Sequence, residues 1–486
     1  MSCRQRVRVG HVPHHQPAPC AAQHTRGTLG PAGDPRSPRL GRQVPARRRI
    51  VERSDDKEVS PMLKHALVLA ALAMQPLAAF AQAGHEGARD VSAPLNTGND
   101  RVIAELRRKG RIGADVSRLI DASSRPDREA MQDALVACRA SGEAAGDAND
   151  TISCALLLAG LSAANGDAPS WANAWHWLRT TGIGLLTHGT GKGSLGKGFD
   201  EVDFAAIGAS APTARYRFAS PTDRLELLPA DLHDATPQVM ITVGGKQVRA
   251  LVDTGAAATL IVPSSMVQAL SLRTLATGLT IIQHAMPSID RSNGTRGWDG
   301  YALADFTIGN LVGKDVLVLV TDRPLARVVI GNEVLSLFGE MAFGDGRLEL
   351  KRPGQAPRPC TAEVPLRFLP GQQFHGRFTI PATINGQTAR LALDSGAGPS
   401  LTVVGHAARQ FAGSPRRAVD ATVGGMPATL DVGTASVALA AGSFSTPSLQ
   451  ASVVQGQAAN VDAILGAPLL IQHRASINFE KGYVCL

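Results

Sequence analysis

Two short motifs in this chain combine the residue types that acid–base chemistry requires. Residues 253–255 read Asp-Thr-Gly and residues 394–396 read Asp-Ser-Gly, so each motif joins a carboxylate to a hydroxyl and a glycine. When two carboxylates lie about 3 Å apart, they cannot both ionise and they share a proton. The ionised carboxylate can then accept a proton from water, while its protonated partner donates one. The motifs predict such a paired site if the fold brings Asp253 and Asp394 together.

An internal repeat surrounds both motifs. A shift of 141 residues places residues 242–262 on residues 383–403 without a gap, and eight of these twenty-one positions are identical. Each copy contains a two-residue turn of the kind that closes β-hairpins, at residues 244–245 and 385–386. The apolar strand after this turn runs directly into the acidic motif. Because both motifs occupy the same position in the repeat, chance is a poor explanation for them.

A second matching block lies downstream in each copy. Residues 329–331 read Val-Ile-Gly and residues 464–466 read Ile-Leu-Gly, and a terminal hairpin pattern follows each block. From about residue 216 onward, short apolar runs alternate with turns rich in Gly, Asn, Asp and Pro. No long amphipathic helix pattern interrupts these runs, so this half of the chain is predicted to be mainly β.

At these residues the chain resembles the aspartic peptidases, and most closely their retropepsin-like branch. Alanine follows the glycine of both motifs (Ala256 and Ala397), and both lobes are short. The resemblance covers about residues 235–486, roughly half of the chain. It implies a mainly β fold with two retropepsin- or pepsin-like β-barrel lobes in one chain, at residues 216–355 and 356–486, preceded by a small α-helical region.

The resemblance also implies a role for the acidic and hydroxyl residues. Asp253 and Asp394 would form the catalytic dyad that activates a water molecule for peptide-bond hydrolysis. The apparent pKa values belong to such a pair as a whole, so neither aspartate is assigned as acid or base. Thr254 and Ser395 would bridge the two loops beneath the dyad, because a hydroxyl can donate and accept at once.

Four glycines complete the predicted site, which includes no metal and no cofactor. Gly255 and Gly396 would let backbone amides approach the carboxylates closely. Gly331 and Gly466 would leave room for the strand that passes behind each catalytic loop. In the first lobe, residues 287–301 suit a mobile flap over the substrate, with an ordinary surface loop as an equal alternative.

The region before the lobes has a helical pattern. Apolar residues recur three and four positions apart at 130–140 and 152–164, which predicts helices within residues 101–185. Residues 84–100 are predicted to be a tether, and residues 186–215, rich in Gly, Ser and Thr, a linker. The helices loosely resemble tetratricopeptide-like hairpins. Two roles remain open for this region: binding a protein partner, or covering the cleft as a removable pro-segment.

Residues 62–83 have the three parts of a secretory signal peptide: a basic start at Lys64, an apolar run, and small residues before a cleavage point. The apolar run is too short for a membrane-spanning helix, and Pro76 interrupts it. A signal peptide acts at an N-terminus, so residues 1–61 are predicted to be a disordered leader or sequence upstream of the true start at Met62. We expect a protein exported to the bacterial periplasm or secreted, without a stable membrane anchor after cleavage.

The positive charge of the chain is concentrated in this leader. The net charge is +8, and residues 1–61 hold twelve Lys and Arg against five Asp and Glu. The remaining chain is close to neutral and shows no basic face of the kind that binds phosphates. Nucleic acid is therefore not an expected partner.

Four cysteines follow the predicted signal peptide: Cys138, Cys154, Cys360 and Cys485. Export would place them in an oxidising compartment, where four cysteines allow three pairings. One pairing joins Cys138 to Cys154 and Cys360 to Cys485, and free buried cysteines are the alternative.

The leading interpretation is an exported aspartic endopeptidase that acts on protein or peptide substrates, at a pH less acidic than pepsin-like members prefer. The alternative is a catalytically weak or inactive peptidase fold that serves as a peptide-binding module of the cell envelope. Both aspartates, both hydroxyls and both motif glycines are present. A decayed enzyme would usually have lost at least one of them.

Overall fold

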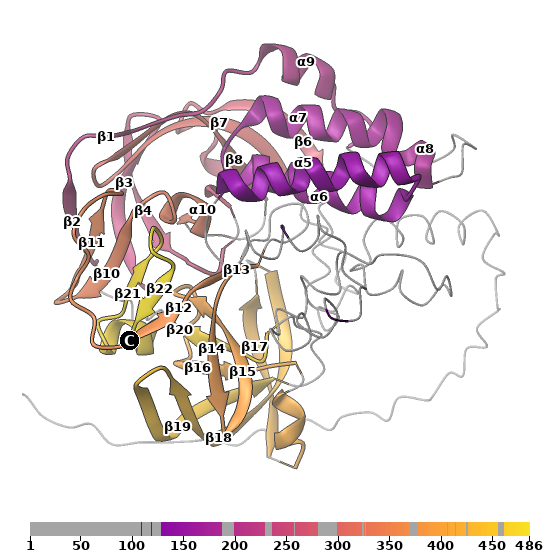
Figure 1. Cartoon of the computed structure of the whole chain (residues 1–486). Helices are drawn as coiled ribbons and strands as arrows, with labels where there is room; N and C mark the ends of the chain where they lie inside the picture. Colours follow the sequence, from indigo (N-terminus) through magenta and orange to yellow (C-terminus); the bar gives the residue numbers. More distant parts are fainter. Residues whose placement is uncertain are drawn as a thin grey trace, which may run out of the picture. The chain divides into compact units, whose positions relative to one another are not determined.

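The computed structural model describes most of the chain from residue 128 onward (Figure 1). The described segments are residues 128–186, 199–228, 236–279, 299–322, 327–369, 377–423, 426–454 and 461–486, without Ala257, His406 and Ser414, and with the isolated residues Arg108, Arg118 and Leu325. The predicted leader, signal peptide and tether lie outside the described residues, as does most of the predicted flap.

A group of helices precedes the first lobe. Its elements are α5 (Arg128–Ala145), α6 (Ala148–Ala164), α7 (Ala168–Trp177), the π-helical turn η2 (Leu178–Gly182), α8 (Ile183–Leu186) and α9 (Phe204–Ser210). The predicted helices are present, and α9 adds a further helix inside the stretch that was expected to be a linker. Gly146 and Gly166 follow α5 and α6 with φ of 67° and 69°, conformations that favour glycine. Asp167 caps α7 by accepting a hydrogen bond from the amide of Ser170.

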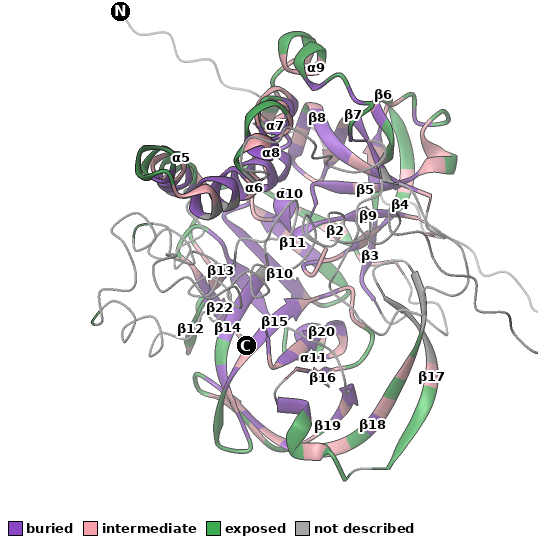
Figure 2. Cartoon of the chain, turned by 90° about the vertical axis from the view of Figure 1, so that its right-hand side faces the viewer, coloured by how far each residue is buried: buried purple, intermediate pink, exposed green. Residues whose placement is uncertain are grey.

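The helices pack on the first lobe through a shared apolar core. In Figure 2, α6 is buried along most of its length, whereas α5 exposes an outer face. The core joins Trp171 and Phe204 of the helical region to Tyr301 and Leu317 of the lobe. A disulfide between Cys138 and Cys154 links α5 to α6. Among the described residues, no helix combines the length and the apolar character needed to span a membrane.

The first lobe is a closed barrel. Six strands pair in the ring β8-β5-β9-β4-β3-β7, which closes because β7 also pairs with β8. They are β3 (Gln238–Val243), β4 (Lys246–Val252), β5 (Leu260–Pro263), β7 (Asp299–Ile308), β8 (Leu311–Thr321) and β9 (Val328–Ile330). Strands β1 (Arg215–Phe218) and β6 (Arg273–Leu279) extend the sheet, the 3-10 turn η3 (Ser264–Met266) follows β5, and the short helix α10 (Asn332–Leu335) follows β9.

The second lobe repeats this arrangement. Its ring is β14-β15-β20-β16-β19-β18, closed by the pairing of β14 with β18. The strands are β14 (Arg377–Ile384), β15 (Gln387–Asp394), β16 (Leu401–Val403), β18 (Met426–Ala441), β19 (Phe444–Val454) and β20 (Ala463–Gly466). Edge strands β13 (Arg367–Leu369) and β17 (Arg416–Val423), the 3-10 turn η5 (Ala407–Phe411) and helix α11 (Ala467–Gln472) complete the lobe. Two barrels with equivalent pairings confirm the predicted mainly β, two-lobed fold.

The predicted turns set the register of both barrels. The turn at residues 244–245 joins β3 to β4, and the turn at residues 385–386 joins β14 to β15. All four turn residues have φ between 50° and 77°, the left-handed region that a type I′ turn requires. This geometry explains why Gly and Asn occupy these positions.

A third sheet joins the two lobes. Its order is β12-β22-β21-β10-β11-β2, in which β10 (Glu340–Gly344) of the first lobe pairs with β21 (Ser476–Asn478) of the second. The other strands are β2 (Thr222–Glu226), β11 (Arg347–Lys351), β12 (Glu363–Pro365) and β22 (Tyr483–Cys485). Met341 pairs with Ile477, residues that occupy equivalent positions in the two lobes. The lobes are therefore related by an approximate two-fold axis that passes through this sheet.

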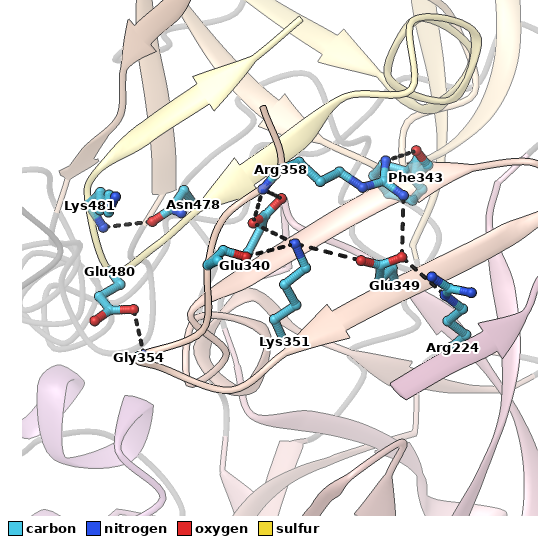
Figure 3. Close-up of polar contacts among 11 residues, drawn as sticks. Arg224, Glu340, Phe343, Glu349, Lys351, Gly354, Arg358, Asn478, Glu480 and Lys481 are labelled. Carbon is cyan, nitrogen blue, oxygen red and sulfur yellow. Dashed lines mark hydrogen bonds and ion pairs between the residues drawn. The ribbon is translucent and has the colours of Figure 1, made fainter. Parts of the chain in front are cut away.

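Ion pairs, which are drawn in Figure 3, and a disulfide fix the connection between the lobes to this sheet. The buried carboxylate of Glu340 pairs with Lys351 at 3.3 Å and accepts a hydrogen bond from the amide of Arg358 at 2.9 Å. Glu349 pairs with Arg224 at 3.2 Å and with Arg358 at 3.5 Å. Cys360 forms a disulfide with Cys485. The two disulfides therefore have the pairing named in the sequence analysis, with one local bridge and one between distant residues.

Candidate active site

Asp253 and Asp394 end equivalent strands in the two barrels. Asp253 follows β4, and its amide donates a hydrogen bond to the carbonyl oxygen of Ile330 at 3.0 Å. Asp394 is the last residue of β15, where it lies opposite Gly466 in the parallel pairing with β20. Because the two barrels share one topology, the approximate two-fold axis brings both strand ends to the same place.

The two carboxyl groups lie in contact and share a hydrogen bond. Each motif glycine packs against the aspartate of the other lobe. A Cβ atom built on Gly255 would lie 2.6 Å from Oδ1 of Asp394, and one built on Gly396 would lie 2.7 Å from Oδ1 of Asp253. Real Cβ atoms do not approach other atoms this closely, so any side chain at either position would displace the opposite carboxylate.

Backbone amides hold one oxygen of each carboxylate. Oδ1 of Asp253 accepts hydrogen bonds from the amides of Gly255 at 2.8 Å and Ala256 at 3.0 Å. Oδ1 of Asp394 accepts one from the amide of Gly396 at 3.0 Å. These contacts hold each carboxylate within the loop that carries it.

The environment of Asp253 favours its protonated form. Burial is the largest cause, and the charge of Asp394 and the hydrogen bond between the two side chains act in the same direction. The amides of Gly255 and Ala256 oppose this effect, but the pKa of Asp253 remains well above its ordinary value. The pair therefore retains a proton at pH values where an isolated aspartate would have lost it.

The two hydroxyls join the loops beneath the carboxylates. Ser395 Oγ accepts a hydrogen bond from the amide of Thr254 at 3.0 Å, and Thr254 Oγ1 accepts one from the amide of Ser395 at 2.9 Å. Ser395 Oγ also donates to the carbonyl oxygen of Val252 at 2.7 Å. Thr254 and Ser395 are completely buried. These crossed hydrogen bonds connect residues 141 positions apart and hold the two motifs in a fixed relation.

A strand end passes behind each loop at a glycine. The amide of Gly331 donates to the carbonyl oxygen of Thr259 at 3.0 Å, and the amide of Gly466 donates to that of Ser400 at 3.0 Å. A Cβ atom at Gly331 would lie 2.7 Å from the carbonyl oxygen of Ala256, and one at Gly466 would lie 2.8 Å from that of Ala397. Only glycine fits at either position, and all eight residues predicted for the site lie in this one region.

One hairpin in each lobe corresponds in position to the predicted flap. In the second lobe, β17 and β18 pair up to Val423 and Met426. In the first lobe, the corresponding hairpin is formed by β6 and β7, and residues 280–298 between them lie outside the described residues. Tyr301, at the end of the predicted flap, is buried, and its ring centroid lies 4.5 Å from that of Trp171. Tyr301 therefore packs into the core shared with the helices.

One charged contact near the site was not predicted from the sequence. Glu333, two residues after Gly331, is buried and forms an ion pair with Arg128 at 3.2 Å. The only sequence signal was a glutamate that, with Asn332, interrupts an apolar block. Its partner lies 205 residues away, and no local pattern identifies a residue at that separation.

Part of the first lobe is similar in sequence to a known protein family. Residues 239–337, about a fifth of the chain, match the family model described as gag-polyprotein putative aspartyl protease. This match lies in the first lobe and confirms the predicted resemblance to the retropepsin-like aspartic peptidases. No curated protein sequence matches the chain.

Two solved structures are similar to parts of the chain. A retropepsin-like aspartic protease from Rickettsia conorii has 14% sequence identity and a TM-score of 0.19, over 29% of this chain and 95% of that one. An aspartic proteinase from Irpex lacteus has 12% sequence identity and a TM-score of 0.35, over 54% of this chain and 96% of that one.

Proposed function

We propose that this protein is an exported aspartic endopeptidase in which Asp253 and Asp394, one from each lobe, activate a single water molecule. The observation that carries the proposal is the contact between the two carboxyl groups, enclosed by Gly255 and Gly396 from opposite lobes. The family match in the first lobe supports a peptidase function independently of this geometry.

The proposed reaction uses one proton shared by the pair. The ionised carboxylate accepts a proton from the water, and the resulting oxygen nucleophile attacks the carbonyl carbon of the scissile peptide bond. The protonated carboxyl donates its proton to the carbonyl oxygen, which becomes a hydroxyl of the tetrahedral intermediate. Collapse of this intermediate breaks the C–N bond. The carboxyl that took the proton from water passes it to the leaving amine, and the other carboxylate takes a proton from one hydroxyl, which restores the singly protonated pair.

The residues around the dyad support this reaction by fixing geometry. Amides from Gly255, Ala256 and Gly396 orient the carboxylates, and the hydroxyls of Thr254 and Ser395 keep the two loops together. The raised pKa of Asp253 keeps the singly protonated pair present at higher pH than an isolated aspartate would allow. Alanine follows the glycine of both motifs, and by the resemblance to retropepsin-like members we expect a pH optimum less acidic than that of pepsin-like enzymes.

Export is part of the proposal. Two disulfides are consistent with folding in an oxidising compartment. Residues 62–83 are proposed as the cleaved signal peptide, and residues 1–61 as a leader that the mature protein lacks. Protein or peptide chains are the proposed substrates.

The test compares the parent chain from Gly84 onward with Asp253→Asn and Asp394→Asn on an unfolded protein substrate, with fragments identified by mass spectrometry. Asp431→Asn is the matched control, because Asp431 is an exposed aspartate of the second lobe that pairs with Arg416. We expect cleavage by the parent and the control and none by either dyad variant. Activity in one of the dyad variants would show that the two aspartates do not form one site.

A further inference from the structure

Arg128, the first residue of α5, makes polar contacts between the helical region and the first lobe. One nitrogen, Nη2, donates to the carbonyl oxygen of Glu333 and to Oγ of Ser336, and lies 3.2 Å from Oε2 of Glu333. The other, Nη1, donates to Oδ1 of Asn165 at 3.0 Å in the turn between α6 and α7. A single guanidinium group thus links two helices of the helical region to α10 of the lobe.

Helix α10 is attached directly to the loop that carries Asp253. The amide of Asn332 donates to the carbonyl oxygen of Ala256 at 2.8 Å, and the amide of Glu333 donates to that of Ala258 at 3.3 Å. The amide of Ala256 in turn donates to the carboxylate of Asp253. Arg128 is therefore connected to the carboxylate of Asp253 through one short helix and one loop.

A second connection runs through β8. The carbonyl oxygen of Gly166, in the turn after α6, accepts a hydrogen bond from the amide of Leu317 at 2.9 Å. The carbonyl oxygen of Leu317 accepts one from Oγ1 of Thr259 at 2.6 Å. Thr259 is buried and lies three residues after Ala256, just beyond the loop that carries Asp253. The first connection reaches the loop at Ala256 and Ala258, and the second reaches the residue that follows it, Thr259.

Apolar contacts extend this interface to the base of the predicted flap. Trp171 of α7 packs against Tyr301, near the start of β7, and against Phe204 of α9 at 5.4 Å between ring centroids. All three side chains are buried. Removing the helices would expose this face of β6, β7 and β8 to water, which is unfavourable for a large apolar surface.

The equivalent position of the second lobe lacks the groups that make this contact. In that lobe, the amides of Gly466 and Ala467 donate hydrogen bonds to the Asp394 loop, as the equivalent amides of the first lobe do to the Asp253 loop. Position 468, which corresponds to Glu333, is a proline and has neither a carboxylate nor an amide hydrogen. The charged attachment is thus a feature of the Asp253 loop and not of the general fold.

We propose that Arg128 and Glu333 are positioning residues that make the helical region a permanent support of the Asp253 loop. The inference rests on the proposed peptidase function and deepens it, because it implies that residues 128–215 stay in the active enzyme and are not removed as a pro-segment. Arg128 acts through its hydrogen bonds to the carbonyl oxygen of Glu333 and to Ser336, and neither bond involves the carboxylate of Glu333.

The charge of Glu333 adds a pH-dependent part to this support. Burial raises the pKa of its carboxyl to about 7, and the opposing effect of Arg128 is smaller. Besides Arg128, the neighbouring ionisable group is Tyr216 of β1, whose pKa is raised mainly by burial and further by the charges of Glu333 and Asp167. The carboxylate is therefore ionised, and its pair with Arg128 fully formed, only above neutral pH.

The test uses the full chain with Arg128→Gln, Arg128→Lys and Glu333→Gln, and Arg215→Gln as the control, since Arg215 forms an exposed ion pair with Asp315 of the same lobe. We expect Arg128→Gln to lower kcat by about tenfold with KM within about twofold, because the dyad is misplaced while substrate contacts remain. Arg128→Lys should recover part of the loss. Glu333→Gln should lower kcat by about threefold at about pH 8 and have no effect at about pH 5, where the parent carboxyl is already protonated.

A second measurement does not depend on activity. Hydrogen exchange read by mass spectrometry should be faster in Arg128→Gln for residues 253–259 and unchanged for the equivalent residues 394–400 of the second lobe. Faster exchange of the first loop supports the positioning role whether or not the parent protein cleaves a substrate. A lack of cleavage by the parent protein would refute only the proposed function. Unchanged exchange, or full activity in an enzyme from which residues 128–215 have been removed, would overturn the inference.

Discussion

Replacement of Ser395 by alanine tests how the two lobes are held together at the site. Its hydroxyl accepts a hydrogen bond from the amide of Thr254 and donates one to the carbonyl oxygen of Val252, both in the opposite lobe. Ser395, Thr254 and Val252 are completely buried. Ser395→Ala therefore leaves one amide and one carbonyl group without these partners in a place that water does not reach.

The magnitude follows from these two groups. A buried backbone group that loses its hydrogen-bond partner costs about 1–3 kcal/mol, so Ser395→Ala should lower the free energy of unfolding by about 4 kcal/mol. This is a large share of the roughly 5–15 kcal/mol that stabilises a typical domain. With a urea m-value of about 3 kcal/mol/M, the midpoint of unfolding should fall by roughly 1 M.

The assay is urea unfolding followed by tryptophan fluorescence and circular dichroism, together with kcat on an unfolded protein substrate. We expect kcat of Ser395→Ala to fall by about 100-fold, because the carboxylates lose their alignment. Ser395→Thr keeps the hydroxyl, as the first lobe does with Thr254, and should recover most of both losses.

Ser436→Ala is the matched control. Ser436 lies on β18 of the same lobe, and its hydroxyl forms an exposed hydrogen bond with Ser448 at 2.7 Å. Its loss should change the free energy of unfolding by less than about 0.5 kcal/mol. If Ser395→Ala unfolds at the same urea concentration as the parent and as Ser436→Ala, the crossed hydrogen bonds do not hold the lobes together and the reasoning is wrong.

Two further predictions concern ionisation. Asp394→Asn removes the charge of Asp394 and should lower the pKa of Asp253 towards its ordinary value without reaching it, because burial is the larger cause. NMR titration of ¹³C-labelled aspartate carboxyl groups would measure this pKa. An unchanged pKa would show that the charge of Asp394 has no effect on Asp253. The pKa of Glu333 rises from 4.5 to about 7 on folding, so the folded state binds more protons between these values and stability falls as pH increases through them. Relative to the parent, Glu333→Gln should therefore gain up to about 3 kcal/mol in the free energy of unfolding between about pH 4 and about pH 8. Denaturant unfolding of both proteins at about pH 4 and about pH 8 measures this gain. If the free energies of unfolding of Glu333→Gln and the parent differ by the same amount at both pH values, the prediction is wrong.

Much of the candidate site was predictable because its signals are local. The left-handed turn residues at 385–386 and the apolar strand that follows determine where Asp394 ends its strand. The same pattern recurs around Asp253, so the repeat predicted a duplicated β unit, and the family resemblance implied that the two copies form two lobes. The helices also follow from periodicity, except α9, which has seven residues and lies in a stretch whose composition is typical of a linker.

The sequence by itself determined the two aspartate loops, the strands that present them and the residue types that can share a proton. Only the tertiary structure decided that Gly255 faces Asp394, that Ser395 bonds to Thr254, and that Arg128 reaches Glu333. Turns and strands depend on the preferences of neighbouring residues, which a sequence displays directly. Contacts between residues 141 or 205 positions apart depend on how complete barrels and helices pack, and that packing leaves no signal in the residues next to either partner.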